Sequence, residues 1–552
     1  MAEPESPAII DVVRAIEREL TAPGAPFEIT EVEIAGHPVR TYRHGARDLA
    51  EILTGIEHRF AGNTLTVGAE THTYAEVFDR ARRLAGLLHR RHGIGAGDRV
   101  GIAMANQPSY LVALFAVARL GAVAVLYNSR GSTAELAAAL DDVPSPVIIA
   151  DPARMTLLRG IALGTALLGT AELDALLADA ADGPEHPVRP EAECLILFTS
   201  GTSGRAKGVR LTHRNITHVV LNMRYVTECN LRIAAHRYGI PLEELRGLVP
   251  PVSTLLIFPL FHVSGLAGLF SALGTGGAVA TMTRWDPEVA AGLIHDHRLT
   301  MMSGPPMTVD ELLRVDGVRE KLGSLVNLTP GGQATPPNLT ARIAATLPVA
   351  QRSAGWGMTE TAGSVCTAGG ALLGEFPETA GPMSPTMQVR VVDADGAEVP
   401  VGTVGELELR GGLVMAGYVG AEPQHGWLRT GDLGYLDEHG LVYLVDRSKD
   451  IVISAGENIA CTEVEAALMA GDAFTEVAAF GVPDERRGER VVVAVTLEPG
   501  VELDAEQVRE LARRTLPEYK VPSEVLFDQS PLPRNATGKL LKRELRRRYA
   551  AR

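Results

Sequence analysis

The fold is decided by the stretch Leu195-Ile-Leu-Phe-Thr-Ser-Gly-Thr-Ser-Gly-Arg-Ala-Lys-Gly-Val209. Its apolar start predicts a buried strand, and the chain then enters a loop of threonine, serine and glycine that ends near Lys207. Glycines let backbone amides converge on an anion, hydroxyl groups add donors, and the lysine supplies positive charge. The Walker A spacing is absent. We therefore predict a phosphate-binding loop of another type, with an ordinary flexible turn as the alternative.

Alternating helices and strands flank this loop. Residues 74–92 and 109–120 have helical periodicity, whereas residues 99–104 and 122–126 are short apolar runs typical of buried strands. This alternation predicts βαβ units with a parallel sheet, and therefore an α/β fold. Beyond about residue 388, short strands of alternating polarity predict a small antiparallel sheet or barrel, and the C-terminal part predicts a separate α+β domain.

Composition narrows the functional class. The chain has 552 residues, 46% apolar and 22% charged, as in a soluble globular protein. Its 52 Lys and Arg against 67 Asp and Glu give a formal net charge of −15. Because phosphate neutralisation needs a positive field, this balance argues against nucleic-acid binding, but not against a small anion held by local donors.

One uncharged segment and the cysteines bear on location. Residues 253–283 carry no Asp, Glu, Lys or Arg, but Pro259 and several glycines interrupt them. We therefore predict a strand, a loop and a small-residue helix rather than a membrane span. The four cysteines are widely spaced, so neither a disulfide framework nor a zinc site is expected. The acidic start does not resemble a signal peptide, and we expect a cytoplasmic protein of unspecified oligomeric state.

Further motifs follow the phosphate loop along most of the chain. They are Pro259-Leu-Phe-His262, Gly331-Gly332, Gly355-Trp-Gly-Met-Thr-Glu360, Gly426-Trp-Leu-Arg-Thr-Gly-Asp432, Asp446-Arg-Ser-Lys-Asp450, Gly456-Glu-Asn458 and Pro531-Leu-Pro-Arg-Asn-Ala-Thr-Gly-Lys539. In content, order and spacing this set resembles the AMP-forming adenylating enzymes, which include acyl-CoA synthetases, carrier-loading adenylation domains and luciferases, and is most similar to the acyl-CoA synthetases. The resemblance implies a large N-terminal domain of α/β subdomains with a small β-barrel-like part, and a small mobile α+β domain.

The resemblance also assigns a nucleotide and metal site. ATP phosphates would be held by Thr199, Ser200, Gly201, Thr202, Ser203, Gly204 and Lys207, with Thr359 on the α-phosphate. Glu360 would bind Mg²⁺, a cation that prefers carboxylate and phosphate oxygens. Trp356 replaces the usual tyrosine on the adenine, where it keeps the stacking face and loses the hydroxyl. Asp432 would accept the ribose hydroxyls and Arg447 would support them, and the remaining nucleotide contacts would come from Gly331, Gly332, Gln333 and Gly357.

Simpler interpretations stand beside these assignments. Glu360 in isolation is a solvated loop carboxylate, Asp432 a turn residue and Arg447 a surface charge. Trp356 and His262 are core residues by default, and only the surrounding motif places His262 at the acyl site. Gln333 stands where relatives have a small residue, and its amide would contact the substrate carboxylate or fill part of the acyl pocket.

Lys539 is the strongest catalytic candidate. Attack of a carboxylate on the α-phosphate builds negative charge, which a well-placed lysine stabilises in the transition state. The neighbouring Lys542, Arg543, Arg546, Arg547 and Arg548 are interpreted as a solvated charge run. The resemblance makes Lys449 a hinge, so that residues 1–446 form the ATP- and acid-binding domain, 447–450 the hinge and 451–552 the mobile domain.

The second half-reaction has weaker support in the sequence. Gly456 and Glu457 would line a tunnel for the thiol, but Ser454, Ala455 and Ala460 replace the arginine, glycine and tyrosine usual on that face. We predict an ATP-dependent ligase that forms an acyl adenylate and then an acyl-CoA thioester on a lipophilic or bulky organic acid. The alternatives are another acid or second nucleophile, such as a carrier-protein thiol, an amine or nitrite, and a non-catalytic nucleotide-binding protein.

Overall fold

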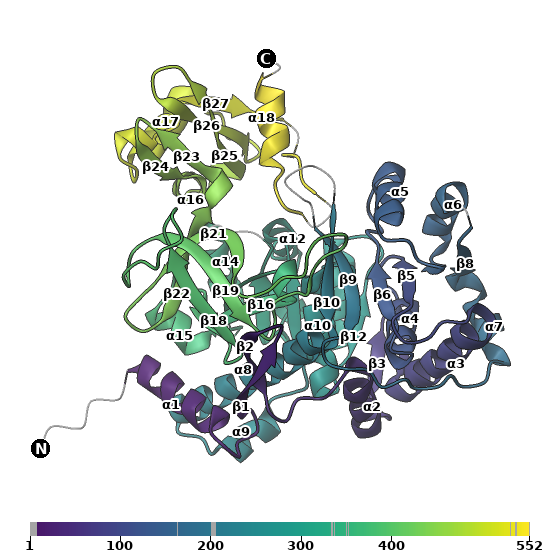
Figure 1. Ribbon diagram of the computed structural model, residues 1–552. Helices are drawn as coiled ribbons and strands as arrows, with labels where there is room; N and C mark the ends of the chain where they lie inside the picture. The colour runs from purple at the N-terminus through teal and green to yellow at the C-terminus, as the bar shows by residue number, and fades with distance from the viewer. Residues whose placement is uncertain are drawn as a thin grey trace, which may run out of the picture.

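Two mostly parallel sheets form the main body (Figure 1). The computed structural model describes residues 8–162, 164–199, 206–332, 335, 337–348, 350–351, 353–529, 531–535 and 538–550. The first sheet runs in the order β20 (Gly417–Tyr418), β10 (Lys207–Thr212), β9 (Glu193–Thr199), β6 (Val123–Leu126), β5 (Arg99–Ala103), β7 (Val147–Ala150), β8 (Ala166–Gly169). The second runs in the order β14 (Asn327–Pro330), β13 (Met301–Gly304), β11 (Thr254–Leu256), β12 (Val279–Thr281), β3 (Thr64–Val67), β4 (His72–Thr73).

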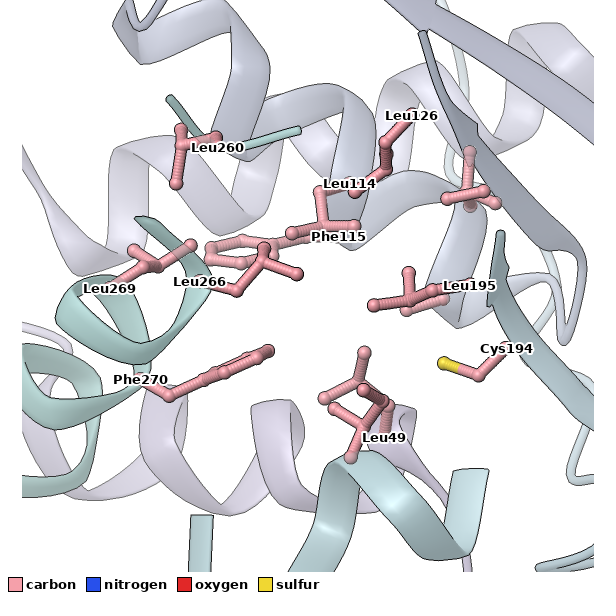
Figure 2. Packing of buried hydrophobic residues seen from close by; sticks show 14 of the residues in the cluster. Leu49, Leu114, Phe115, Leu126, Cys194, Leu195, Leu260, Leu266, Leu269 and Phe270 are labelled. Carbon is pink, nitrogen blue, oxygen red and sulfur yellow. The ribbon is translucent and has the colours of Figure 1, made fainter. Parts of the chain in front are cut away.

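Helices cover these sheets and fill the space between them. They are α1 (Ile9–Thr21), α2 (Leu49–Phe60), α3 (Tyr74–His92), α4 (Pro108–Arg119), α5 (Thr133–Asp142), α6 (Pro152–Ile161), α7 (Leu173–Ala178), α8 (His213–Tyr238), α9 (Leu242–Leu248), α10 (Val263–Thr275), α11 (Pro287–Asp296), α12 (Pro306–Leu312), α13 (Val318–Lys321), α14 (Pro337–Thr346) and α15 (Gly370–Glu375). The central core lies where α4 meets α10. Figure 2 shows Leu114 and Phe115 of α4 facing Leu266 and Phe270 of α10, with the Cys194 sulfur pointing into the same apolar space.

The local sequence explains why these elements form where they do. Helix α3 begins at a capping box, in which the Thr73 side chain accepts from the Glu76 amide and Glu76 reaches back to the Thr73 amide. It ends at Gly93, whose φ of 69° is accessible to glycine at little cost. The predicted helix over residues 74–92 is therefore confirmed to the residue. The predicted parallel βαβ units are also confirmed, since β5 pairs in parallel with both β6 and β7.

A smaller antiparallel sheet follows, as predicted. Its order is β17 (Gly381–Pro382), β22 (Leu441–Arg447), β21 (Leu428–Leu436), β19 (Gly405–Gly411), β18 (Met387–Val392). Two hairpins stand apart from it, β1 (Ile29–Ile34) with β2 (His37–Tyr42), and β15 (Ser353–Met358) with β16 (Gly363–Gly369). The strand, loop and helix expected within residues 253–283 are present as β11 and α10. No helix in the described part of the chain has the length and apolar character that crossing a membrane requires.

The C-terminal elements lie together at the top of Figure 1. Strands β23 (Ile451–Ser454), β24 (Glu457–Ala460), β25 (Phe474–Asp484), β26 (Gly488–Leu497) and β27 (Glu524–Phe527) form one sheet, packed with α16 (Cys461–Met469), α17 (Ala505–Arg513) and α18 (Lys542–Ala550). This part has hydrophobic clusters of its own on both faces of the sheet. All four cysteines lie in the described residues as unpaired thiols, in line with the absence of a disulfide framework.

Candidate active site

The sequence motifs converge on one cleft. It has a volume of about 3130 Å³, well above the 300–1,000 Å³ typical of a small-molecule pocket, so it has room for more than one ligand. Its lining includes the predicted residues Thr199, His262, Gly331, Gly332, Trp356, Gly357, Asp432, Arg447, Lys449 and Lys539. Lys207 follows the lining residue Ala206, and Thr359 and Glu360 follow Gly357 closely in the chain. Residues from both ends of the sequence therefore share one site.

A hydrogen bond and an ion pair hold the carboxylate of Asp432. The Trp356 indole Nε1 donates to Asp432 Oδ2 at 2.7 Å, and Arg447 Nε lies 3.0 Å from Asp432 Oδ1. Asp432 and Arg447 are direct partners in the β21–β22 ladder, which explains why their side chains meet. Asp432 is only 7% exposed, so both of its oxygens depend on nearby donors rather than on bulk water.

The turn after β15 carries Thr359 and Glu360. Gly357 has to be glycine here, because a Cβ would lie 1.9 Å from the Gly363 carbonyl oxygen across the β15–β16 hairpin. The chain then forms a short 3₁₀ turn over Thr359–Thr361. Tyr418 donates its hydroxyl to Glu360 Oε1 at 2.8 Å, and the Met415 amide donates to the Glu360 carbonyl. The Lys207 ammonium lies 5.0 Å from the centre of the same Tyr418 ring, so Tyr418 connects the predicted metal and phosphate residues.

The donor set suits a metal that is shared with phosphate. The described residues contain no cluster of three or more His, Cys, Asp and Glu side chains arranged to hold a metal. Mg²⁺ commonly takes one or two carboxylates and completes its shell with phosphate oxygens and water. A single carboxylate, with acceptor positions beyond the one that Tyr418 uses, fits that pattern.

His262 faces the cleft from the start of α10. The loop before it is held by Asn106, whose side-chain nitrogen donates to the Leu256 and Phe258 carbonyls and whose oxygen accepts from the Leu260 amide. Burial, with the charge of Lys539 nearby, lowers the pKa of His262 to about 4. The imidazole is therefore neutral at pH 7, and its buried Nδ1 has no hydrogen-bond partner among the described residues.

Lys539 enters the cleft from the C-terminal part of the chain. Burial and the positive charge of Arg447 lower the pKa of its ammonium to about 8, while Asp432 acts in the opposite direction. The preceding Gly538 has a φ of +84° and approaches Pro305 of the main body so closely that an added Cβ would lie 2.9 Å from the proline ring. The loop thus lies directly against the body of the protein, with Lys539 close enough to Asp432 and Arg447 for their charges to shift its pKa.

A buried ion pair holds the Lys539 loop. Glu476 of β25 bonds Arg534 through Nε at 3.0 Å and Nη2 at 2.5 Å, and its other oxygen accepts from the Leu532 amide at 2.7 Å. Arg534 Nη1 also donates to the Gly538 carbonyl at 2.6 Å. Neither partner is well exposed, at 15% for Arg534 and 8% for Glu476, so the pair fixes the loop on both sides of the turn.

One interpretation of the basic tail is wrong. Lys542 was expected to be a solvated charge, but its Nζ forms a 2.8 Å ion pair with Glu465 and its side chain is only 14% exposed. Arg546 lies partly buried, 3.5 Å from Asp450. By contrast, Arg547 and Arg548 pair with Glu544 on the exposed face of α18, as a solvated run predicts. The spacing of α18 therefore directs Lys542 and Arg546 inward.

Several predicted residues lie elsewhere. Gly456 lies in the exposed turn between β23 and β24, Glu457 is the exposed first residue of β24, and neither is part of the cleft lining. Lys449, which does line the cleft, is exposed in the short turn Ser448–Asp450, at the connection between β22 and the C-terminal elements. Ser200, Gly201, Thr202, Ser203, Gly204 and Gln333 lie outside the described residues.

Comparison with known proteins identifies the family. A family described as AMP-binding enzyme matches residues 57–419, and one described as AMP-binding enzyme C-terminal domain matches residues 463–539. The chain belongs to the AMP-binding enzyme family. A feruloyl-CoA synthase from Amycolatopsis sp is 35% identical over 87% of this chain and 95% of its own length. A 2-succinylbenzoate–CoA ligase from Bacillus cereus is 31% identical over 83% and 90%.

Solved structures agree with this family assignment. The ATP-bound MatB of Rhodopseudomonas palustris superposes on this AMP-binding enzyme with a TM-score of 0.78, 27% identity and coverage of 91% of this chain and 99% of the other. The o-succinylbenzoate CoA synthetase of Bacillus subtilis, in complex with its acyl-adenylate intermediate, gives a TM-score of 0.75 at 27% identity, with coverage of 90% and 97%. The same enzyme in complex with ATP and magnesium gives 0.74 at 28% identity, with coverage of 90% and 98%.

Sequence reasoning missed four supporting residues of this AMP-binding enzyme. Tyr418, Asn106, Arg534 and Glu476 each hold a predicted residue or its loop in place. Arg534 lies inside the quoted C-terminal motif, which was a usable signal. Tyr418 follows a glycine at a strand end, and Asn106 follows an apolar strand, both ordinary places for a turn residue. Glu476 carried no signal, because a glutamate in an apolar strand reveals its partner only in the folded structure.

Proposed function

We propose that this AMP-binding enzyme is an ATP-dependent acid–CoA ligase. In the first step, a carboxylate oxygen of the acid bonds to the α-phosphorus of ATP and pyrophosphate leaves. In the second, the CoA sulfur bonds to the acyl carbon, its proton is released, and AMP leaves. The observation that carries the proposal is the position of Lys539, which reaches from the C-terminal elements into the cleft beside Asp432 and His262.

Each described side chain has a task in the first step. Asp432 and Arg447 place the ribose, which leaves the α-phosphate near Thr359 and Lys539. The Lys539 ammonium stabilises negative charge that develops on the phosphate oxygens and on the departing pyrophosphate, a contribution greater in the transition state than in the ground state. Mg²⁺, when bound by Glu360 and the phosphates, neutralises charge on the same groups. Lys207 and the loop that begins at Thr199 hold the pyrophosphate end.

The acid is proposed to be a bulky organic acid with an aromatic ring. Near His262 the cleft is lined by Phe258 and Phe261 and by small residues of α10, namely Ser264, Ala267, Gly268 and Ser271. The small side chains leave volume for a wide acyl group, and the aromatic rings favour a planar one. Relatives described as feruloyl-CoA synthase and 2-succinylbenzoate–CoA ligase act on aromatic acids, which supports this choice.

The second step requires another arrangement of the C-terminal part. We propose that residues 1–446 and 451–552 are the two domains, with 447–450 as the hinge and Lys449 exposed within it. Rotation about this hinge withdraws Lys539 and brings the turn of Gly456 and Glu457 to the cleft, where the absence of a side chain at Gly456 admits the thiol. The proposed reaction is cytoplasmic, and the unpaired cysteines support this part of the proposal.

The two steps are tested by measuring the two products separately. Pyrophosphate and AMP release are followed across a panel of acids that spans ring-substituted cinnamates, benzoates and linear fatty acids, with and without CoA. We expect pyrophosphate release with one or more of the aromatic acids, and AMP release that depends on CoA. The Lys539→Ala variant is expected to lose pyrophosphate formation by about a hundredfold to a thousandfold, as for loss of a charge-stabilising group.

A matched variant identifies the contribution of the lysine. Arg548→Ala removes an exposed cation on α18, in the basic tail that follows Lys539, and this variant should retain full activity. Retention of pyrophosphate release by Lys539→Ala would contradict the role assigned to Lys539. AMP release that ignores CoA, but responds to a carrier-protein thiol or an amine, would replace the second step while leaving the first intact.

A further inference from the structure

The protein's own side chains use part of the hydrogen-bonding capacity of the Asp432 carboxylate. An ionised carboxylate has about four acceptor positions, two on each oxygen. Trp356 Nε1 takes one position on Oδ2 by a hydrogen bond of 2.7 Å, and Arg447 Nε forms an ion pair with Oδ1 at 3.0 Å. Each oxygen therefore keeps at least one acceptor position, which is enough for the two hydroxyl groups of a ribose.

We propose that Trp356 is a positioning residue that couples the stacking of the base to the recognition of both ribose hydroxyls. The inference rests on the proposed function in taking ATP as the nucleotide and Asp432 as the residue that holds its ribose. Its indole face lines the cleft where the base binds, while its N–H holds the Asp432 carboxylate in one orientation. The enzyme therefore selects ribonucleotides, because a deoxyribonucleotide leaves a buried acceptor unsatisfied.

Three features of the site favour coupling over simple packing. Trp356 is 6% exposed and Asp432 is 7% exposed, so water does not readily replace either partner. The two residues come from separate hairpins, β15–β16 and β21–β22, and the hydrogen bond joins these at the cleft. A phenylalanine or tyrosine ring preserves a stacking face but has no N–H where the indole nitrogen lies. Only tryptophan can therefore both stack and donate to Asp432 at this position.

The experiment compares nucleotide affinities without acid or CoA. Equilibrium dissociation constants for Mg·ATP, Mg·2′-deoxy-ATP and Mg·3′-deoxy-ATP are measured for the wild type and for Trp356→Phe and Trp356→Tyr. In the wild type, each deoxynucleotide should bind about tenfold or more weakly than ATP, as expected for a lost hydrogen bond to a buried charged group. In both variants ATP should bind more weakly than in the wild type. The loss of affinity caused by removing the ribose hydroxyl that faces Oδ2 should fall to about twofold or threefold.

A second tryptophan provides the control. Trp285 Nε1 also donates to a carboxylate, at 2.5 Å to Glu311 Oε2, and it does not line the cleft. Trp285→Phe thus removes the same type of bond and should leave all three affinities unchanged. An unchanged or increased ribose preference in both Trp356 variants, with ATP still bound by the wild type, overturns the coupling alone. Failure of the wild type to bind ATP overturns the proposed function as well.

Discussion

At the scale of single residues, a few side chains define the site through charge and hydrogen bonding. Burial lowers the pKa of the Lys539 ammonium, the positive charges of Arg447 and Lys449 lower it further, and the negative charges of Asp432 and Asp450 oppose these effects. The resulting pKa of about 8 lies close to neutral pH, so the charge of the catalytic candidate depends on solution conditions in the working range.

The pKa of Lys539 predicts a basic limb in the pH profile of the first half-reaction, that is, a rate that falls at high pH. Lys539 stabilises the transition state only when protonated, so kcat/KM for pyrophosphate formation should be highest below pH 8 and fall up to about tenfold per pH unit above it. Bound ATP adds negative charge, which raises the pKa of Lys539, and the limb in kcat should lie at higher pH. Lys539→Arg keeps its charge throughout and should be slower with no such limb. A wild-type profile that stays flat up to pH 10 would contradict the assignment.

Tyr418 gives a second prediction at this scale. Its hydroxyl holds one oxygen of Glu360, and removal of this bond in Tyr418→Phe should loosen the carboxylate by about 1 kcal/mol. We expect the Mg²⁺ concentration for half-maximal pyrophosphate release to rise severalfold, with most of the rate recovered at saturating Mg²⁺. Tyr435→Phe, in a stacked pair with Tyr443, is the matched control. A loss of rate that excess Mg²⁺ does not recover would assign Tyr418 to another task.

At the scale of elements, the loop that carries Lys539 depends on β25. The Arg534–Glu476 pair and the bond to the Leu532 amide anchor this loop on the C-terminal sheet. Since breaking a buried ion pair leaves an uncompensated charge, Glu476→Gln should destabilise the protein by about 3 kcal/mol and slow adenylation.

The two half-reactions separate this effect from general unfolding. Because Lys539 is proposed to act only in adenylation, Glu476→Gln should slow pyrophosphate release at least tenfold more than it slows CoA-dependent AMP release from added acyl adenylate. Thermal unfolding followed by circular dichroism identifies a temperature at which the wild type and Glu476→Gln both remain folded. Equal losses in both half-reactions would mean that the pair stabilises the C-terminal sheet without orienting the lysine.

Elements with local signals were predictable from the sequence, and contacts between distant residues were not. The capping residues and periodicity of α3 lie within residues 73–93, and the predicted bounds matched. The motifs also indicated that Asp432 and Trp356 share a site. The hydrogen bond between them was missed, because it joins residues 76 positions apart and depends on the angle between two hairpins. Lys542 was misinterpreted for the same reason, since only the packing of α18 brings it to Glu465.

At the scale of the whole molecule, polar side chains at the surface join the C-terminal part to the body of the protein. Arg314 reaches Glu498 at 3.1 Å, and the Asn338 side chain donates to the Gly471 carbonyl at 3.4 Å. Beside the proposed hinge, the Thr462 amide donates to Asp446 Oδ2 at 3.1 Å and its hydroxyl to the Val445 carbonyl at 2.8 Å. Because these contacts are single hydrogen bonds and an ion pair at the surface, the C-terminal part and the body could separate without loss of either hydrophobic core.

These contacts predict that surface charge sets the balance between the two half-reactions. Because an exposed ion pair contributes about 0–1 kcal/mol, Glu498→Arg should shift the population of this arrangement by no more than several-fold. We expect slower pyrophosphate release, equal or faster AMP release from acyl adenylate, and weaker effects in high salt. Arg314→Glu alone should have the same effects as Glu498→Arg. The double variant with swapped charges should recover the wild-type ratio of pyrophosphate release to AMP release. If the double variant only adds the two losses, Arg314 and Glu498 do not act as a pair, and the arrangement depends instead on the contacts of Thr462 and Gly538.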